Sequence, residues 1–512
     1  MAAALDLPLQ ALRDTVADLR AHVQQLLPDG DVDANQVAAN ELAWAVACSD
    51  AAVATAEWAD ATGDALASDV AEAAIAEAAS AITGRSAIGA IEQTPLLERI
   101  AGAYRPLMDL GLSEEQRLLR ETFRDFAERE IRPRAAEVHR LNLDIPEDLL
   151  RGLAELGTFG LSIPEAYGGS KSEGQGSKDD FETMLIVTEE LSRGSLAAGG
   201  SLVTRPEILV VALVRGATEE QKRRWLPVIA SGEKLVSVAA TEPDHGSDIA
   251  GITCRAERVG DGWLVNGAKL WSTFAGRAEI MMLLARTADA GHRGLSLFVV
   301  EKPAFSGHQF TFRQPGGGWL EGRAIPTIGY RGMHTFELSF DNFHLPGDAL
   351  VGSEEWLNRG FYLQMESFAM GRLQTAGRAV GVMQAALEDA LAYASQRIVF
   401  GKPIARFGLP RTMLGRMIVQ VATARRLSYR AARLLAEGQG AGQIEASLAK
   451  LYASRMAEQV TRNAMQIHGG MGYAEETNVS RYFVDARVLS IFEGAEEVLA
   501  LRVIAKSLLA SG

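Results

Sequence analysis

The chain has 512 residues, of which 47% are hydrophobic, and its 65 Asp and Glu against 51 Lys and Arg give a formal net charge of -14. This length supports a large buried core and about three domains, and the acidic balance argues against a nucleic-acid partner, because phosphate binding requires a basic surface. Two cysteines are too few for a disulfide framework, and the eight histidines show no metal-ligand spacing, so we expect no bound metal.

The N-terminal sequence has no basic segment followed by an apolar run, and the longest apolar stretches, such as residues 208–214, are much shorter than a membrane span. We therefore expect no export signal, no membrane span and a cytoplasmic location. Residues 1–105 are rich in alanine, carry apolar residues at helical spacing and have a Pro-Asp-Gly break at 28–30. They predict a helical extension used for packing or assembly.

The next predicted domain is an N-terminal helical domain at residues 106–234. The segment Ser113-Glu-Glu-Gln116 has the pattern of a capping box, in which two side chains satisfy free backbone N–H groups at a helix start. Apolar residues then recur on one face, as an amphipathic helix requires. Further helices are predicted at 146–157, 180–192 and 218–230.

The pattern then changes twice. Between residues 235 and 352, short apolar and β-branched runs separated by Gly-Asp-Gly and Asn-Gly turns predict a middle β domain. Residues 353–512 again show long helical segments, enough for an antiparallel bundle. Because helices, strands and helices follow one another in blocks, we predict an α+β fold with segregated layers rather than a parallel α/β sheet.

Two segments of the β domain carry groups suited to a ligand. Hydroxyls and backbone N–H groups in the loop Ala240–Asp248 suit an anionic or carbonyl acceptor, although composition alone favours a turn that merely closes a hairpin. In Trp271-Ser272-Thr273, an indole and a hydroxyl two residues apart would lie on the same side of a strand. A core tryptophan explains that segment equally well.

Two further segments lie at predicted helix ends. The segment Arg397-Ile-Val-Phe400-Gly-Lys-Pro403 is typical of a cationic helix C-terminus stopped by Gly and Pro. Gln466-Ile-His468-Gly469-Gly470 ends a helix in glycines that would let the backbone approach a ligand closely, although a Gly-rich helix stop explains it equally well. His468 is more typical of a capping or core histidine than of a base.

The last segment is Phe492-Glu493-Gly494, which holds a carboxylate between apolar residues just before the final helix. Acidic residues at helix N-termini are usually electrostatic caps. A catalytic carboxylate is the sharper hypothesis for Glu493.

Together and in this order, these segments resemble the acyl-CoA dehydrogenase family over about four fifths of the chain, from Leu112 to Leu509. The matching motifs are Thr-Glu-Pro-x-x-Gly-Ser-Asp at 241–248, Trp-x-Thr at 271–273, Arg-x-x-Phe-Gly-Lys-Pro at 397–403, Gln-x-x-Gly-Gly-x-Gly at 466–472 and aromatic-Glu-Gly at 492–494. The resemblance implies a helical domain, a middle β domain and a four-helix bundle that follow the extension. It also implies FAD as the cofactor, an electron-transfer flavoprotein as the acceptor, and a homodimer or homotetramer in which a neighbour completes each flavin site.

The resemblance also implies roles for individual residues. Glu493 would be the catalytic base, and the substrate would contact Ser247, Arg372 and Gly494. The flavin ring would contact Val238, Ala240, Thr241, Gly246, Ser247, Trp271, Ser272 and Thr273. The adenine and pyrophosphate would contact Arg397, Phe400, Gln466, Gly469 and Gly470 of the neighbouring subunit, and Ala495 and Glu497 would complete the cofactor contacts.

The sequence departs from the family pattern at three points. Phe407-Gly408 replaces a His-Gln or similar pair, Ala495 replaces a Thr and Ala369 replaces an Asp. Together with the long extension and the segments Gly329-Tyr-Arg-Gly-Met333 and Arg372-Leu-Gln-Thr-Ala376, these departures make the chain resemble a branch of the family that oxidises (2S)-methylsuccinyl-CoA to mesaconyl-CoA in the ethylmalonyl-CoA pathway. That substrate has a free carboxylate that needs a cation in the pocket, for which Arg205 and Arg372 are the candidates. For Arg205, a surface position or a CoA-phosphate contact is an equal alternative.

Two other functions stay open. Within the class, the chain would be a glutaryl-CoA or a short- or branched-chain acyl-CoA dehydrogenase. From another class comes a DNA-associated protein with this fold, against which the acidic balance argues.

Overall fold

The computed structural model describes residues 2–27, 30–83, 86–171, 178–437 and 442–510, so Pro28 and Asp29 of the predicted break lie outside the described residues. Backbone packing divides the chain into two compact units. The first comprises Met1–Glu128, Phe181–Leu196 and Arg372–Gly512, and the second comprises Arg129–Asp180 and Ala197–Gly371.

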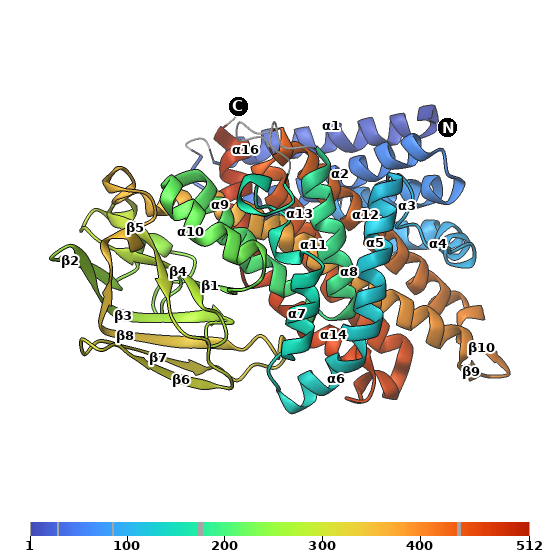
Figure 1. Cartoon of the computed structure of the whole chain (residues 1–512). Helices are drawn as coiled ribbons and strands as arrows, with labels where there is room; N and C mark the ends of the chain where they lie inside the picture. Colours follow the sequence, from blue (N-terminus) through green and yellow to red (C-terminus); the bar gives the residue numbers. More distant parts are fainter. Residues whose placement is uncertain (1, 28–29, 84–85, 172–177, 438–441, 511–512) are drawn as a thin grey trace. The chain divides into compact units, whose positions relative to one another are not determined.

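The second unit contains an eight-stranded, mostly antiparallel sheet (Figure 1). Its strand order is β1-β4-β2-β3-β8-β7-β6, with β5 paired to β4 off this path, and the β1·β4 and β2·β4 pairs are parallel. The strands are β1 (Val236–Ala239), β2 (Arg255–Val259), β3 (Gly262–Thr273), β4 (Ile280–Arg286), β5 (Leu295–Glu301), β6 (Gln309–Arg313), β7 (Trp319–Ala324) and β8 (Thr335–Leu345). Strands and helices occupy separate stretches of the chain, which confirms the predicted α+β fold.

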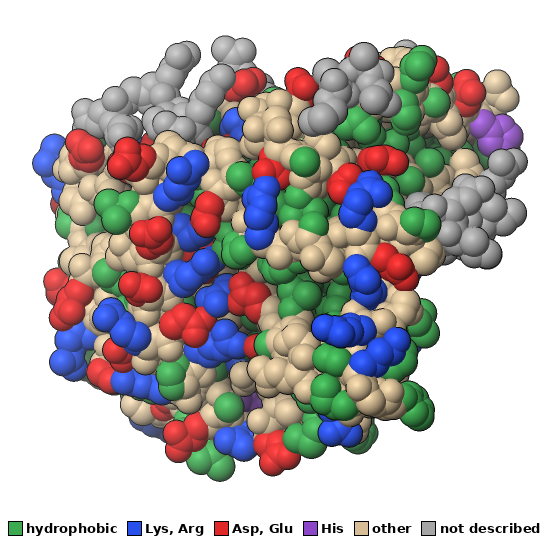
Figure 2. Space-filling view, turned by 90° about the vertical axis from the view of Figure 1, so that its right-hand side faces the viewer, with side chains coloured by type: hydrophobic (Ala, Val, Ile, Leu, Met, Phe, Trp, Pro, Cys, Tyr) green, Lys and Arg blue, Asp and Glu red, His purple; other side chains and the backbone are tan. Residues whose placement is uncertain are grey.

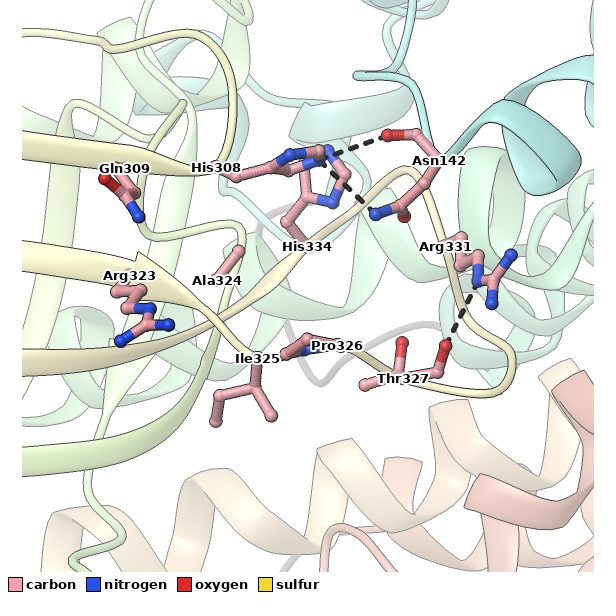
Figure 3. Close-up of a pocket in the computed structure, with 10 residues that line it drawn as sticks. All are labelled: Asn142, His308, Gln309, Arg323, Ala324, Ile325, Pro326, Thr327, Arg331 and His334. Carbon is pink, nitrogen blue, oxygen red and sulfur yellow. Dashed lines mark hydrogen bonds between the residues drawn. The ribbon is translucent and has the colours of Figure 1, made fainter.

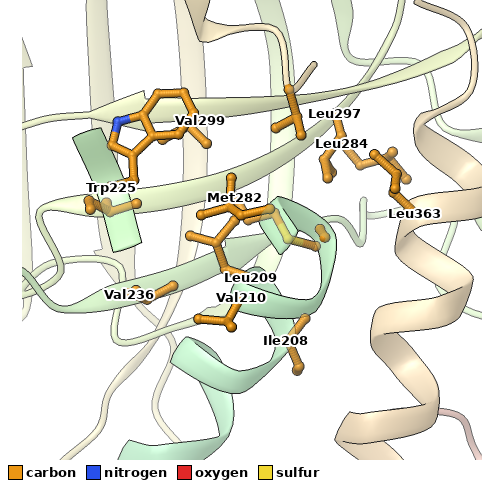
Figure 4. Packing of buried hydrophobic residues seen from close by; sticks show 14 of the residues in the cluster. Ile208, Leu209, Val210, Trp225, Val236, Met282, Leu284, Leu297, Val299 and Leu363 are labelled. Atoms are coloured by element: carbon orange, nitrogen blue, oxygen red, sulfur yellow. The ribbon is translucent and has the colours of Figure 1, made fainter. Parts of the chain in front are cut away.

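Helices pack on one face of this sheet and bury apolar side chains of β1, β4 and β5 (Figure 4). The helices of the unit are α6 (Arg132–Leu141), α7 (Glu147–Glu155), α9 (Ser201–Gly216) and α10 (Glu219–Ala230). Leu209 and Trp225 from the helices pack in one buried cluster with Met282 and Val299 from the sheet. The Trp225 indole N–H also donates to Glu301 Oε1 at 2.9 Å. This core fixes β1, whose C-terminal end leads directly into the motif loop at Ala240.

The segment Leu196–Gly216 is long and apolar enough to cross a membrane by length and composition, yet 89% of its most apolar window is buried inside the structure. That burial comes from its packing on the sheet, where Ile208, Leu209 and Val210 are part of the core. An interior helix of a folded domain has the same apolar character, so the segment is weak evidence for a membrane span.

Among its described residues, the first unit is helical apart from one small hairpin, β9 and β10. Its helices are α1 (Ala2–Leu26), α2 (Gln36–Thr62), α3 (Ala65–Thr83), α4 (Ser86–Gly102), α5 (Glu114–Phe126), α12 (Gly408–Ala436), α13 (Gln443–His468), α14 (Asn478–Ala486), α15 (Glu496–Val498) and α16 (Lys506–Ala510), together with most of α8 (Lys178–Gly194) and α11 (Gly360–Gln396). The capping box at Ser113 is present, with both reciprocal hydrogen bonds formed.

The helices of the N-terminal extension pack against the C-terminal helices of the same unit. In α2, Ala43, Ala47 and Ala51 are fully buried and recur every four residues, so they line one face of the helix. Side chains this small let helices approach closely, and α2 packs on α12 and α13. The predicted helical extension is therefore confirmed as a packed part of the fold.

The β-like runs in the sequence lie at residues 235–240, 263–265, 280–285, 295–300 and 336–340, so strands β2, β6 and β7 were not predicted. Helices α6, α9 and α14 were not predicted either. In β2, only Ala256 of five residues is buried, so the strand lacks the alternation that identifies a strand from sequence. Pairing with β3 over its whole length defines it instead.

Charged side chains of both signs are mixed on the face shown in Figure 2. Lys and Arg alternate with Asp and Glu over most of the described part of this face, and no broad region of one sign stands out there. A duplex-binding surface concentrates its cations in one patch or stripe, so this face lacks the charge segregation that such binding uses.

Candidate active site

Glu493 lies in a strained loop between a short 3-10 turn, Arg487–Ser490, and helix α15. Its backbone φ is 55°, in the left-handed region, and the following Gly494 has φ 99°. A non-glycine residue in this region costs about 1–2 kcal/mol, and such residues persist only where the surroundings hold them. The Glu493 backbone is therefore held in one orientation by its neighbours.

The Glu493 carboxylate is paired with a buried cation. The Nη2 atom of Arg378 lies 2.9 Å from each carboxylate oxygen, and Thr375 Oγ1 donates to Oε2 at 2.5 Å. The Arg378 side chain is fully buried, and its guanidinium carbon lies 4.6 Å from the centroid of the Phe492 ring. Both oxygens that could accept a proton are thus engaged by donors from α11.

A second arginine of α11, Arg372, lies near the same carboxylate. Its guanidinium donates to Ser447 Oγ at 3.3 Å, and its Nε is buried without a hydrogen-bond partner in the described part of the chain. Burial lowers the pKa of Arg372 to about 10, against the opposing effect of the Glu493 charge. The predicted base and one predicted substrate contact therefore come together.

Lys450 holds the opposite side of the loop. It is fully buried in α13, and its Nζ donates to the Gly494 carbonyl at 2.7 Å. Burial lowers the pKa of Lys450 to about 7, although Glu493 and Glu496 act in the other direction. Next along the loop, Ala495 is the N-cap of α15, and Glu497 is exposed in its first turn.

In the second unit, a buried ion pair anchors the motif loop 240–248. Lys269 Nζ lies 2.8 Å from Glu242 Oε1 and 3.0 Å from the Ala240 carbonyl, and both side chains are buried. Glu242 also accepts N–H bonds from Thr253 and Cys254. Burial acts to raise the pKa of Glu242, but Lys269 and these N–H donors outweigh burial, so the pKa is lowered.

The residues predicted to contact the cofactor lie on and beside this anchored loop and differ in exposure. Val238 and Thr241 are partly buried and Ala240 is buried, whereas Gly246 and Ser247 are exposed. A Cβ added at Gly246 would meet only Thr241 Cγ2, at 3.9 Å, so the loop is open above this glycine.

The prediction that Trp271 and Thr273 lie on the same side of β3 is wrong. The register between β3 and β8 shifts between Lys269 and Ser272, and Trp271 adopts φ 60° in this irregularity. The bulge breaks the two-residue alternation, so Trp271 is 54% exposed while Thr273 is buried, with its Oγ1 3.2 Å from Thr335 Oγ1. Ser272 is fully buried, and its hydroxyl has no partner in the described part of the chain.

These features fit a flavin. An exposed indole offers a plane for stacking, the unpaired Ser272 hydroxyl can still form a hydrogen bond, and the open glycine admits a ligand edge close to the backbone.

Arg397 and Phe400 lie on an exposed hairpin rather than on a simple helix stop. Helix α11 ends at Gln396, and strands β9 (Ile398–Val399) and β10 (Lys402–Pro403) follow. Phe400 and Gly401, the two turn residues, have φ 47° and 79°, as the twist of a two-residue hairpin requires. The Phe400 side chain is 92% exposed.

The glycine motif after α13 is also exposed. Gln466, Gly469 and Gly470 are exposed, and a Cβ added at either glycine would meet nothing within 4 Å. His468 is buried, its Nδ1 lies 2.8 Å from the Ala464 carbonyl, and its ring stacks on Tyr393 at 4.3 Å. The interpretation of His468 as a satisfied core histidine is supported.

Arg205 is not a surface residue. It is 7% exposed in α9, and its Nη1 donates to the Tyr330 hydroxyl at 3.1 Å and to the Ser201 carbonyl at 3.3 Å. These contacts lie within the second unit, whereas Arg372 and Arg378 belong to the first.

Four features of the site were not predicted from the sequence: Arg378, Thr375, Lys450 and the Glu242–Lys269 pair. Arg378 lies 115 residues from Glu493 in the sequence, so no local pattern connects them. A charged residue inside an otherwise apolar stretch of α11 was the one available signal.

A cavity of about 210 Å³ in the second unit contains none of the predicted site residues (Figure 3). Its lining includes Asn142, His308, Arg331 and His334. His308 Nε2 lies 3.1 Å from the Asn142 carbonyl, Arg331 donates to the Thr327 carbonyl, and His334 lies 2.9 Å from Asp144. Because these polar groups already have partners, we assign no ligand to the cavity.

Comparison with known proteins identifies the family. Three family models match: "Acyl-CoA dehydrogenase, N-terminal domain" at residues 113–233, "Acyl-CoA dehydrogenase, middle domain" at 237–343 and "Acyl-CoA dehydrogenase, C-terminal domain" at 358–509. The chain is 42% identical over 405 residues to (2S)-methylsuccinyl-CoA dehydrogenase of Cereibacter sphaeroides, which covers 78% of this chain and 70% of that protein.

Solved structures agree with the family models. Butyryl-CoA dehydrogenase from Megasphaera elsdenii superposes with a TM-score of 0.71 at 31% identity, covering 78% of this chain and 100% of that chain. A glutaryl-CoA dehydrogenase from Mycobacterium smegmatis in complex with FADH2 gives 0.68 at 26% identity, covering 77% and 94%. This chain therefore belongs to the acyl-CoA dehydrogenase family and is an FAD-dependent oxidoreductase that acts on acyl-CoA substrates.

Proposed function

We propose that this enzyme oxidises (2S)-methylsuccinyl-CoA to mesaconyl-CoA, with Glu493 as the base that removes the α-proton. A relative with that substrate in its name is 42% identical over 405 residues. The observation that carries the proposal is a partly buried cation near Glu493 that forms no ion pair in the described part of the chain.

Arg372 is that cation. It forms no ion pair within the described part of the chain, and its hydrogen-bond partner, Ser447, is neutral. Its buried Nε keeps an unused N–H donor, and removing a charge from water is costly unless it is paired, so this position favours a ligand with an anionic group. The free carboxylate of a methylsuccinyl group meets this requirement, whereas a butyryl group does not.

Arg378 gives a second argument for a dicarboxylic substrate. It binds both oxygens of Glu493 in the absence of substrate. A substrate carboxylate would compete with Glu493 for Arg378 and would also pair with Arg372. The site would then hold two cations, Arg372 and Arg378, and two anions, Glu493 and the substrate carboxylate. We infer that this competition frees an oxygen of Glu493 to accept the α-proton.

Arg205 remains a weaker candidate for the distal carboxylate. Its Nη1 already donates to the Tyr330 hydroxyl and to the Ser201 carbonyl. Arg372 instead keeps an unpaired donor.

The chemical step follows from the proposed base. Glu493 takes the α-proton on a carboxylate oxygen, and the electron pair of the α C–H bond forms the α,β double bond as the β-hydrogen leaves as hydride. FAD, when bound, supplies the acceptor for that hydride. The backbone N–H of Glu493 is proposed to donate to the thioester oxygen, which gains negative charge during the step.

The proposed cofactor contacts are those implied by the family motifs. They comprise Val238, Ala240, Thr241, Gly246, Ser247, Trp271, Ser272, Thr273, Ala495 and Glu497, with Arg397, Phe400, Gln466, Gly469 and Gly470 supplied by a neighbouring subunit of a dimer or tetramer. The exposure of Phe400 and of the 469–470 glycines supports a role toward a second chain. Ser247 and Gly494 are proposed substrate contacts, and an electron-transfer flavoprotein is the proposed acceptor.

Anaerobic reduction of the bound flavin tests the proposal. Methylsuccinyl-CoA, glutaryl-CoA, isobutyryl-CoA and butyryl-CoA are each mixed with the purified protein, and loss of flavin absorbance is followed. Fastest bleaching by methylsuccinyl-CoA is the expected result, and the Glu493→Gln variant should keep its flavin but not bleach. Faster bleaching by glutaryl-CoA or by a monocarboxylic thioester would overturn the substrate assignment, and bleaching of Glu493→Gln would overturn the base.

A further inference from the structure

The segment that follows Glu493 is packed against the N-terminal extension. Val23, Leu27, Val32, Ala39 and Leu42 form a buried cluster with Ala505, and Leu501, Leu508 and Leu509 pack on it. At its edge, Arg502 pairs with Asp33 at 2.7 Å. The extension therefore contacts residues 499–510, the part of the chain that follows the Glu493 loop. Figure 1 shows this C-terminal part near α1.

Trp44 of the extension is linked to the residues just after Glu493 by one side chain, that of Arg455. The Trp44 ring of α2 stacks on the Tyr452 ring, with centroids 5.8 Å apart and planes 18° apart. The Arg455 guanidinium carbon lies 4.5 Å from the Trp44 ring centroid, and Arg455 Nε lies 3.2 Å from Glu496 Oε2. Glu496 is the first residue of α15, three positions after Glu493.

Helix α13 holds the same loop at two further points. Lys450 donates to the Gly494 carbonyl at 2.7 Å, and Ser454 donates to the Leu489 carbonyl at 3.1 Å. Ser454 thus contacts the chain before Glu493, and Lys450 and Arg455 contact it after Glu493. The extension contacts the Arg455 side chain through Trp44.

The loop needs such support because Glu493, a non-glycine residue, has a φ of 55°. Strained residues of this kind relax unless their surroundings over-determine them. A partly exposed ion pair alone restrains little, since the Arg side chain is free to move between rotamers. Stacking on Trp44 removes that freedom by fixing the guanidinium plane, which makes the Arg455–Glu496 contact directional.

We propose that Trp44 is a positioning residue for the catalytic glutamate, acting through Arg455 and Glu496, and that the N-terminal extension therefore supports catalysis as well as packing. The proposal rests on the proposed role of Glu493 as the base. The extension holds the loop in the geometry in which the Glu493 carboxylate and backbone N–H meet the substrate.

The test compares Trp44→Leu and Arg455→Met with the conservative variants Trp44→Phe and Arg455→Lys. Trp58→Leu is the matched control, because Trp58 also lies in α2 and stacks with an arginine, Arg426, whose guanidinium carbon is 4.3 Å from the ring centroid. Arg426 belongs to α12, and its other contacts are with Tyr429 and the Leu107 carbonyl. All variants are studied as FAD-bound enzyme. The measurements are kcat, KM, melting temperature and backbone hydrogen–deuterium exchange of peptides covering residues 489–499.

We expect Trp44→Leu and Arg455→Met to lower kcat by about tenfold to a hundredfold with KM nearly unchanged, because small displacements of a reacting group have effects of this size. Exchange at residues 489–499 should become faster, and Trp44→Phe and Arg455→Lys should recover part of both effects. Trp58→Leu should lower the melting temperature while kcat and loop exchange stay as in the unchanged protein.

Unchanged exchange of residues 489–499 in Trp44→Leu, or an equal loss of kcat in Trp58→Leu, would overturn the proposal. If the proposed role of Glu493 as the base is wrong, the experiment gives a different result. In that case Glu493→Gln would remain active, while the exchange measurement would still report whether Trp44 restrains the loop.

Discussion

The Nη2 atom of Arg378 lies 2.9 Å from both carboxylate oxygens of Glu493, and the arginine side chain is completely buried. The pair joins the middle of α11 to the strained loop before α15. Removing the cation alone would leave the carboxylate, itself 8% exposed, with Thr375 as the donor that remains from this group.

Arg378→Met should therefore lower the free energy of unfolding by about 3 kcal/mol, the cost of leaving one member of a buried ion pair unpaired. The double variant Arg378→Met with Glu493→Gln should recover much of that loss, because it removes both charges. Chemical denaturation of the two single variants and the double variant measures the coupling. Additive losses in the double variant would show that the two charges do not stabilise each other.

Arg372→Met should reduce kcat/KM for methylsuccinyl-CoA by roughly a hundredfold, since losing the cation that binds a buried carboxylate costs about 2–5 kcal/mol. Turnover of butyryl-CoA should change only a few-fold, because that substrate has no distal carboxylate. Steady-state kinetics with both thioesters gives the ratio. Arg205→Met is the comparison variant: if it shifts the ratio and Arg372→Met does not, the distal carboxylate is bound by Arg205 instead.

Lys269→Met should destabilise the second unit by about 3 kcal/mol, because it leaves the buried Glu242 carboxylate without its cation. Glu242 also anchors the loop that carries Gly246 and Ser247, so the variant should release FAD more readily. Thermal unfolding and the flavin content after gel filtration measure the two effects. If the double variant Lys269→Met with Glu242→Gln regains stability but still loses flavin, the ion pair stabilises the unit and shapes the loop as two separate effects. Unaltered flavin retention in Lys269→Met alone would contradict the anchoring role.

The sequence predicted the elements whose signals are local. Helix α10 was expected at 218–230 and spans Glu219–Ala230, and the capping box at Ser113 formed as expected. Strand β2 was missed because Arg255, Glu257 and Arg258 are exposed, and pairing to β3 defines a strand whose own residues carry no alternation.

The candidate site divides in the same way. The motif identified Glu493, but the groups that hold it come from α11 and α13, and Arg378 and Lys450 resemble ordinary helix residues until the fold brings them to the loop. The exposure of the Trp271 side chain depends on a β-bulge in the pairing of β3 with β8. The sequence of β3 by itself does not reveal that bulge. The roles assigned to these residues stay predictions.

The buried Lys450 should make stability depend on pH above neutrality. Burial lowers its pKa to about 7, while the unfolded chain keeps the ordinary value of about 10.4. Between these values the unfolded state binds more protons than the folded state, so stability should rise with pH from about 7 to 10. Lys450→Met should flatten this part of the curve. Lys302, whose pKa burial also lowers to about 7, adds a slope of the same sign, so the difference between the two proteins is the quantity to compare.

Phe400 gives a prediction in which stability and cofactor binding change in opposite directions. Its φ of 47° belongs to a hairpin position that favours Asn or Gly, and its ring is 92% exposed. Phe400→Asn should therefore keep or raise the melting temperature, by an amount corresponding to about 1 kcal/mol or less. If the ring contacts FAD of a neighbouring subunit, the variant should lose flavin faster on dilution, which fluorescence of the released cofactor measures. Leu409→Asn is the matched control, because Leu409 is 75% exposed near the same hairpin and is not a proposed contact. Equal flavin loss in both variants would mean that general surface polarity, rather than the Phe400 ring, affects retention.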